Sequence, residues 1–189
     1  MSAQQLLKKI NSLTCTEPKF GGAKNKKFSN SIVKIEKKPV SVKLNGNLFM
    51  LPKRDESEFG IKYSMGVEFL EEDCALLDAI LDKLEVDDWE RKECHNEGSI
   101  FLTLKPNTGH TDFKCTSNLS IKPLKLYNDK LDTGMEVTVD MAVSGWYMQD
   151  EDTRKYGLTL KVKSLFFGPP PSKRKRKDDD EVRGVWFLS

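Results

Sequence analysis

The sequence lacks most of what an enzyme active site requires. It holds only two histidines among 189 residues. It has no glycine-rich phosphate loop, no nucleophile-elbow motif and no metalloprotease or kinase signature. The paired acids Asp87 and Asp88 stand in an acidic stretch, which we expect to be solvated loop. These absences predict a protein that is not an enzyme and that needs no cofactor.

Long apolar runs and dense cysteine patterns are missing as well. No stretch approaches the roughly 20 apolar residues of a membrane span, and the first residues lack the apolar core of a secretory signal. The four cysteines stand apart from one another, which favours reduced thiols in the nucleus or cytoplasm. We therefore expect no disulfide and no contact with a membrane.

Zinc binding is the weaker interpretation of the cysteines and histidines. Cys94, His95, His110 and Cys115 together offer two thiols and two imidazoles, a set that zinc accepts. However, neighbours on an extended strand point to opposite sides, which separates Cys94 from His95. The usual CxxC spacing is also missing. The sequence therefore favours no metal site, with Cys115 as a small buried hydrophobe.

The net charge of +2 conceals a block pattern. Residues 1–54 carry 12 Lys and Arg against 2 Asp and Glu, residues 55–99 carry 4 against 15, and residues 100–177 carry 14 against 8. Basic segments thus flank an acidic one, as expected if one face meets a polyanion and another is kept away from it. The alternative is that the charges are only solvated surface.

The length fits one domain with two tails. Residues 1–30, with a short helix predicted over Leu6–Leu13, are expected to form a basic, partly flexible arm. Residues 31–168 are expected to form the folded domain. Residues 169–189 begin with three prolines, which stop the last strand, and form a flexible tail.

Alternation of apolar and polar residues predicts strands in the first half of the domain. Val40–Leu51 alternates, and Asn45 with Gly46 inside it predicts a hairpin turn, because both residues tolerate positive φ. A charged loop is expected at Pro52–Glu58. Ile61–Phe69 then gives five alternations in a row, which indicates a strand with one buried face.

The second half predicts one helix and further strands. Apolar spacing changes to 3, 4 and 7 residues in Glu71–Leu84, which indicates a helix. Strands return at Ile100–Lys105 and Thr111–Thr116. The clearest prediction is an antiparallel hairpin of Met135–Tyr147 and Tyr156–Phe167 around a polar turn. This inventory predicts a mainly β fold with one inserted helix, an OB-fold-like, partly open barrel of five or more strands.

Nucleic-acid binding requires basic residues for phosphates and aromatic faces for bases. The alternation predicts that one solvent-facing side of the strands carries both kinds of residue. The candidate contacts are Lys43, Lys53, Arg54, Lys62, Phe101, Lys105, Trp146, Tyr147, Arg154, Lys155, Lys161 and Lys163. The alternative for the aromatic members is that they close the ends of the core.

The tail contains two further motifs. Its basic block predicts nuclear import or nonspecific phosphate contacts, and it consists of Lys173, Arg174, Lys175, Arg176 and Lys177. The bulky residues Trp186, Phe187 and Leu188 follow an acidic run. A segment of this composition cannot fold alone, so we expect it to dock on a partner or on its own domain.

Three segments within Phe49–Phe167 carry a resemblance to a known family. They are FMLPKRDESEFGIKYSMGVEFLEEDCALLDAILDKLE, SIFLTLK and GMEVTVDMAVSGWYMQDEDTRKYGLTLKVKSLFF, of which the last is the most specific. Their order resembles the single-stranded DNA-binding proteins of DNA viruses and phages, especially the short-tailed coliphage type with its OB-fold. The resemblance implies a protein that coats and protects single-stranded DNA in viral replication or recombination, with a tail that recruits replication proteins.

The tail departs from this family. It ends in Val-Trp-Phe-Leu-Ser after only four acids and an arginine, and a basic block precedes it. This difference suggests a eukaryotic host and a location in the host nucleus or at a cytoplasmic replication site. Two rival functions stay open: a nuclear protein-interaction module that acts through the tail, and binding of single-stranded RNA. A homo-oligomer is compatible with each of them.

Overall fold

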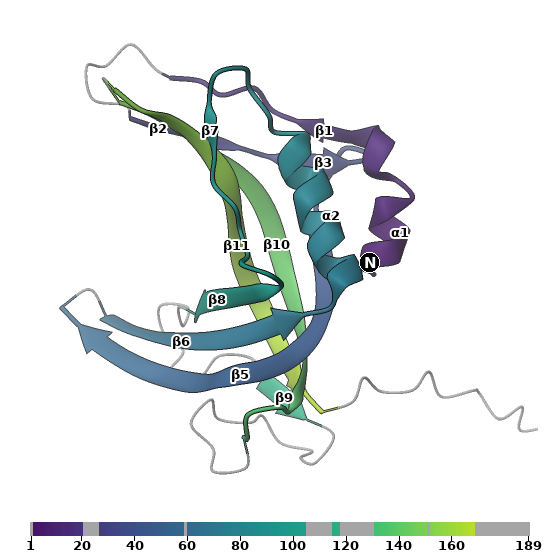
Figure 1. Cartoon of the computed structure of the whole chain (residues 1–189), viewed down its shortest axis with the longest axis vertical. Coiled ribbons are helices and arrows are strands. Elements are labelled where there is room, and N and C mark those ends of the chain that lie inside the picture. The colour runs from purple at the N-terminus through teal and green to yellow at the C-terminus, as the bar shows by residue number, and fades with distance from the viewer. Residues whose placement is uncertain are drawn as a thin grey trace, which may run out of the picture.

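Strands dominate the computed structural model, which describes residues 2–20, 27–58, 60–104, 115–117, 131–150 and 152–168. Figure 1 shows a long hairpin crossed by a bent group of strands, with two helices beside it. The elements are α1 (Ala3–Leu7), the 3₁₀ helix η1 (Ile10–Ser12), β1 (Leu13–Cys15), β2 (Phe28–Ser31), β3 (Val33–Ile35), β4 (Lys38–Pro39), β5 (Ser41–Ser57), β6 (Gly60–Phe69), α2 (Glu71–Asp82), β7 (Glu90–Arg91), β8 (Ser99–Leu104), β9 (Cys115–Ser117), β10 (Glu136–Gln149) and β11 (Arg154–Phe167).

The described strands form two sheets. The smaller has the order β1-β3-β4, and the larger has the order β7-β11-β10-β5-β6-β8, with β2 and β9 paired outside this path. The larger sheet bends but does not close into a barrel. The predicted mainly β class is confirmed.

The hairpin of β10 and β11 is the centre of the larger sheet. Its antiparallel pairing runs from Val137 opposite Phe167 to Gln149 opposite Arg154, with an irregularity after Asp140. The other edge of β10 pairs with β5 along its first half and with β2 along its second. The predicted hairpin is thus confirmed, and it is flanked on both edges.

β5 is longer than the sequence predicts, because two expected interruptions are wrong. Asn45 and Gly46 lie inside the strand and pair with β10. Gly46 permits a close approach rather than a turn, since a Cβ atom there would meet the carbonyl oxygen of Glu68 at 2.2 Å. The predicted charged loop is strand as well, because residues 53–57 pair with β6.

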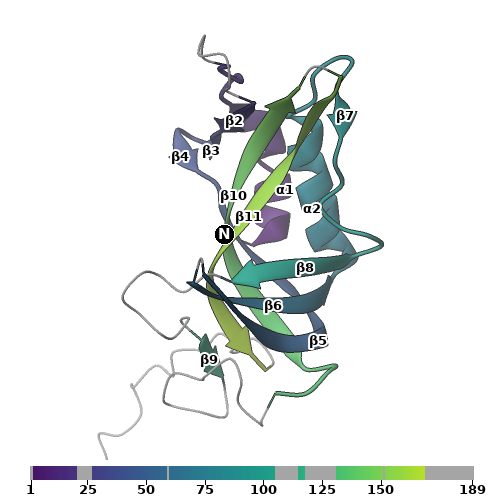
Figure 2. The same cartoon turned by 90° about the vertical axis from the view of Figure 1, so that its left-hand side faces the viewer.

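The predicted helix is present as α2. Its apolar stripe of Leu76, Leu77, Ile80 and Leu81 is fully buried, and three acids occupy its first turn, where they favour the helix dipole. Figure 2 shows α1 and α2 together on one side of the β10–β11 hairpin. Among the described residues, neither helix has the length and apolar character that crossing a membrane requires.

The N-terminal helix begins earlier than the sequence predicts. The side chain of Ser2 accepts a hydrogen bond from the Gln5 backbone N–H, and the Gln5 side chain accepts one from the Ser2 backbone N–H. This capping box fixes the helix start. Ala3 and Leu6 are buried, and β1 pairs with β3. The first described residues therefore pack on the domain.

The later short strands agree with the prediction where they are described. β8 matches the predicted strand Ile100–Lys105 to within one residue at each end. Of the predicted strand Thr111–Thr116, only Cys115 and Thr116 lie within the described residues, and they belong to β9, which pairs in parallel with β11. The fold therefore has β11 paired at both ends with short strands.

One carboxyl group in this core couples stability to pH. Asp73 is 2% exposed and accepts a hydrogen bond from the Asn45 backbone N–H at 2.5 Å. Burial raises the pKa of Asp73 from 3.8 to about 6. The folded protein therefore keeps this proton in a pH range where the unfolded chain has lost it. Protonation of Asp73 in the folded state contributes to the unfolding free energy. This contribution is full below pH 3.8 and is lost as the pH rises through about 6.

We expect Asp73→Asn to remove this pH dependence, because an amide does not titrate. Between about pH 4 and about pH 7, the unfolding free energy of the variant should rise relative to wild type by roughly 2 to 3 kcal/mol. Urea unfolding of both proteins across this range measures the difference. A difference that stays constant with pH would contradict the assignment.

Candidate nucleic-acid interface

The two sides of the central hairpin differ in exposure. Along β10 burial alternates residue by residue, so that Tyr147 is buried and Trp146 lies on the opposite side. Paired residues of antiparallel strands point to the same side, so this side continues across β11, β5, β6 and β8. We call the side of the sheet opposite the core the outward face.

Three lysines of β5 and β11 gather on the outward face on either side of β10. Lys43 pairs with Asp140 of β10, and Lys161 pairs with Ala142 two residues along. Lys163 Nζ donates a hydrogen bond to Ser41 Oγ at 2.9 Å. All three side chains are exposed, and none forms an ion pair with another described residue. We call Lys43, Lys161 and Lys163 the lysine cluster.

One carboxylate lies within the lysine cluster. Asp140 Oδ1 accepts a hydrogen bond from Ser41 Oγ at 3.2 Å. The three lysines and Asp140 together carry a formal charge of about +2, because a single carboxylate faces three ammonium groups. The cluster can therefore attract a polyanion to the middle of the sheet.

Trp146 lies on the outward face and not in the core. Its ring covers Gly157 of β11, where a Cβ atom would meet the indole at 2.8 Å. The indole Nε1–H donates to the carbonyl oxygen of Leu158 at 3.2 Å. These contacts hold the ring flat on the sheet and leave it half-buried.

Phe28 of β2 is an exposed neighbour of Trp146 that the sequence did not suggest. It pairs with Met148, two residues beyond Trp146, and its side chain is 59% exposed. Diagonal neighbours on one side of a sheet lie roughly 7 to 8 Å apart, so both rings are within reach of one ligand. The sequence prediction assigned Phe28 to the N-terminal arm, which hid its place on the sheet.

Tyr147 belongs to the core, in agreement with the alternative considered for it. Its side chain is 3% exposed, and its hydroxyl donates to the carbonyl oxygen of Leu84 at 2.9 Å. The ring stacks on Tyr156 and meets Trp89 edge to face. Burial raises the pKa of Tyr147 to about 12. A base cannot reach this ring without disrupting the core.

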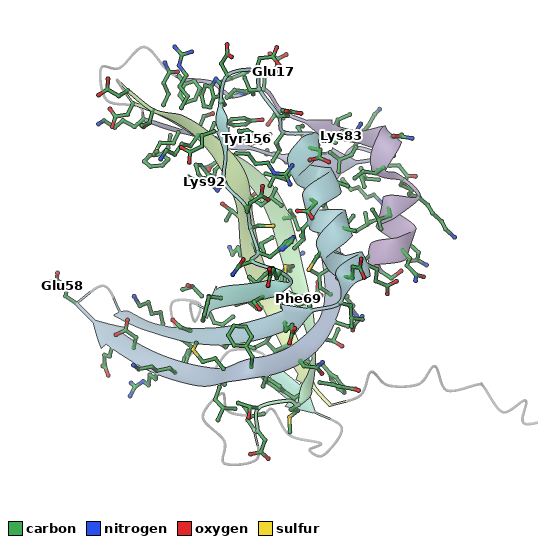
Figure 3. The ribbon with its side chains drawn as sticks, viewed as in Figure 1. Glu17, Glu58, Phe69, Lys83, Lys92 and Tyr156 are labelled. Carbon is green, nitrogen blue, oxygen red and sulfur yellow. The ribbon has the colours of Figure 1, made fainter. Side chains whose placement is uncertain are left out.

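The strands beyond Gly46, which we call the β5–β6–β8 arm, carry a second pair of aromatic rings. Figure 3 shows Glu58 at the free end of this arm and Phe69 at the end next to α2. Phe101 is 68% exposed and meets Phe49 edge to face, with ring centres 5.3 Å apart. Phe49 covers Gly66, where a Cβ atom would approach its ring to 2.4 Å.

Phe49 was not predicted as a candidate, although burial along β5 alternates through it, with Leu48 buried and Phe49 exposed. Gly66 was the signal in the sequence that an aromatic ring could lie on this part of the sheet. A glycine between the two core residues Met65 and Val67 occupies an outward position, and an isolated strand glycine often marks a close approach.

A row of acids separates the aromatic pair of the arm from the lysine cluster. Asn47 pairs with Glu136 on one side and with Glu68 on the other. Both glutamates are exposed on the outward face. A phosphate chain that runs from the lysine cluster to Phe101 therefore has to pass two like charges, which disfavours that route.

Three of the predicted cations already have carboxylate partners. Arg54 pairs with Glu56 at 3.1 Å, Lys62 pairs with Asp55 at 2.9 Å and Lys155 pairs with Glu90 at 3.1 Å. Lys53 and Arg154 are exposed, and within the described part of the chain neither forms an ion pair. The structure thus divides the predicted cations into neutralised and free groups.

Several predicted residues lie outside the described part of the chain. They are Lys105 and His110, the basic block Lys173 to Lys177, and the tail residues Trp186, Phe187 and Leu188. Their predicted roles in phosphate contact, metal binding, nuclear import and partner docking stay predictions.

The structure also corrects the expectation that Cys94 and His95 point to opposite sides of a strand. Cys94 and His95 do not lie on an extended strand; the chain bends at Cys94, and both side chains reach Asp78 of α2. Burial raises the pKa of the Cys94 thiol to about 12 and that of Cys74 to about 11. The side chain of Cys115, the fourth residue of the predicted set, is outside the described part.

Comparison with models of known protein families finds no match, and comparison with curated proteins finds none either. The function therefore has to be inferred from the chemistry of the outward face.

Proposed function

We propose that the chain is a sequence-nonspecific single-stranded DNA-binding protein that holds the strand along the outward face of β10 and β11. The observation that carries the proposal is the lysine cluster, whose members Lys43, Lys161 and Lys163 are exposed and form no ion pair with another described residue. Aromatic rings lie farther along the same face. The biological setting we propose is coating and protection of single strands in viral DNA replication or recombination.

Electrostatics favours the hairpin over the arm as the phosphate site. A free ammonium group releases condensed counterions when it meets a phosphate, and this release supplies most of nonspecific affinity. Lys62 and Arg54 of the arm are already neutralised by Asp55 and Glu56. A phosphate would have to replace these carboxylates, whereas the lysine cluster requires no such exchange.

The aromatic residues at the end of the hairpin can hold bases. Trp146 is fixed by its contact with Gly157 and its bond to Leu158, so stacking on it costs little ordering of the side chain. Phe28 is exposed beside it. Stacking accepts every base, because each has a π-face, and this fits binding without sequence preference.

The path from phosphate site to base site is short and carries no further acid. Between Lys161 and Trp146 the outward positions are Ala142, Ser144 and Thr159. Trp146 lies four positions after Ala142 on β10, which is about 13 Å of strand. A few nucleotides can cover this distance.

An OB-fold is the specific architecture that we propose for the strands. The meander of β5, β6 and β8 joins the long hairpin through β5, and α2 lies against the core side, features that support a bent, open relative of that fold. The helix is inserted between β6 and β8. The absence of catalytic motifs in the sequence supports binding without chemistry.

Binding to single-stranded oligo-dT, compared with duplex DNA and oligo-rU, tests the proposal directly. We expect the tightest binding to oligo-dT of about 15 nucleotides, a length within the range of one such domain. Equal affinity for the duplex, or no binding to any of the three, would refute it. Tighter binding to oligo-rU would instead make RNA the ligand of this face.

The lysine cluster should account for much of the salt dependence. We expect the triple variant Lys43→Gln, Lys161→Gln, Lys163→Gln to bind oligo-dT more weakly, with a log–log salt slope smaller in magnitude by about 2, since each phosphate contact contributes about 0.7. Fluorescence titrations at several salt concentrations measure the slope.

A matched control changes the net charge equally at other places. Lys8, Lys37 and Lys83 are exposed lysines off the outward face of the hairpin, and their triple replacement by glutamine should leave the slope nearly unchanged. Equal losses in the two triple variants would mean that net charge alone drives binding, against a site at the lysine cluster.

The rings beside the hairpin should contribute to affinity. Phe28→Ala is expected to cost roughly 1 to 3 kcal/mol of binding to oligo-dT, or about 5- to 150-fold in Kd. Trp146→Ala should weaken binding by a similar amount. It should also lower the unfolding free energy somewhat, because Gly157 loses the ring that covers it. Phe101→Ala serves as the control on the arm and should change Kd by less than about twofold. A large loss in Phe101→Ala with none in Phe28→Ala would move the base site to the arm.

A further inference from the structure

Three side chains with metal-binding atoms converge between α2 and the segment that leads into β8, and a fourth, Cys74, lies near them on α2. Asp78 comes from the middle of α2, and Cys94 and His95 come from the bend before β8. One ligand atom from each of these three lies within 4.8 Å of the others. Cys74 stands one helical turn before Asp78 on the same side of α2. The feature is independent of the outward face.

The spacing of the donor atoms suits a small tetrahedral ion. His95 Nε2 lies 3.2 Å from both carboxylate oxygens of Asp78. In a tetrahedral zinc site with ordinary bond lengths, adjacent ligand atoms stand about 3.3 to 3.8 Å apart. The His95–Asp78 distances are close to this range, and the distances to Cys94 Sγ are no more than 4.8 Å.

Cys74 is the fourth candidate ligand, because it and His95 both contact Gly98. Its Sγ lies 4.0 Å from the carbonyl oxygen of Gly98, and the Gly98 N–H donates to His95 Nδ1 at 3.4 Å. Cys74 is 5% exposed, and it is a free thiol, as is Cys94. The thiol of Cys94 and the imidazole of His95 lie beside Asp78, and Cys74 Sγ, which is outside the 4.8 Å group, would have to move toward them to join.

The path of the chain explains why these residues meet. The segment after α2 reaches the end of the hairpin at β7 and then returns beside the helix (Figure 1). Residues 92–98 thus run alongside the turns of α2 that carry Cys74 and Asp78. The short bridge of Asn96 with Ser99 holds the bend.

We propose that Cys74, Asp78, Cys94 and His95 bind one zinc ion that ties α2 to this segment. Two thiolates and an imidazole are soft or borderline ligands, which favour zinc over magnesium or calcium. Four protein ligands fill a tetrahedral shell, so the ion has a structural role and no open position for substrate.

The charges and protons of the reaction balance. Binding of Zn²⁺ releases one proton from each thiol, and His95 binds the ion through Nε2 with its ring proton on Nδ1. The Gly98 contact at 3.4 Å is then given up. Two thiolates and a carboxylate leave the site with one negative charge, which Arg91 opposes from 3.3 Å at Asp78 Oδ1. A ligating carboxylate commonly has such an outer partner.

Cobalt titration of the reduced full-length chain tests the site. Co²⁺ replaces zinc in tetrahedral sites, and it reports thiolate ligands through a charge-transfer band in the near ultraviolet. We expect saturation at one equivalent, tetrahedral visible bands and loss of both signals when Zn²⁺ is added. Zinc should also raise the Tm of the wild-type chain. No thiolate band and no change in Tm would overturn the proposal.

Single substitutions assign the ligands. Cys74→Ser, Cys94→Ser and His95→Gln should each weaken cobalt binding by at least about tenfold, and Asp78→Asn offers a milder change if a cysteine variant fails to fold by circular dichroism. Cys15→Ser removes a thiol outside the group and should bind as wild type does. Loss of the band in Cys115→Ser with retention in Cys74→Ser would overturn this ligand set in favour of the one that includes Cys115 and His110.

Discussion

The pairing of β10 with its neighbours is the constraint on which the rest of the structure depends. β10 pairs with β11 along its whole length and with β5 and β2 on its other edge. With both edges occupied it cannot rotate, so each residue is committed to one side of the sheet. Tyr147 thereby reaches Leu84, two residues after the end of α2, through its hydroxyl, and Trp146 is left on the outward face. Core and candidate interface are two sides of one strand.

The charge blocks of the sequence acquire separate places in this arrangement. The acidic block supplies α2 and the segment after it, where Arg91 is surrounded by Asp78, Asp82 and Glu93. Lys43, Lys161 and Lys163, which form no ion pair with another described residue, lie on the outward face of the hairpin. Repulsion from the acidic side and attraction to the lysine cluster act together to orient a polyanion. The proposed zinc site uses the acidic side, where a cation is favoured.

Sequence patterns predicted the elements with strong periodicity and missed what depends on tertiary contacts. Alternation found the hairpin, and 3.6-residue spacing found α2, because each pattern reports one buried face. Asn45 and Gly46 gave a strong turn signal, yet the strand continues since Glu68 needs the space at Gly46. Lys62 meets Asp55 because β5 continues into the segment predicted as a loop, Phe28 joins the sheet because β2 pairs with β10, and Cys94 reaches Asp78 from another element. No local pattern contains that information.

Chemical footprinting of lysines tests the central claim most directly. The full-length chain is treated with an amine-acylating reagent with and without saturating oligo-dT, and modification at each lysine is measured by mass spectrometry. The account predicts that Lys43, Lys161 and Lys163 lose reactivity when the strand is bound, while Lys53 on the arm and Lys83 at the end of α2 keep theirs. Protection of Lys53 or Lys83 with no change in the lysine cluster would contradict it.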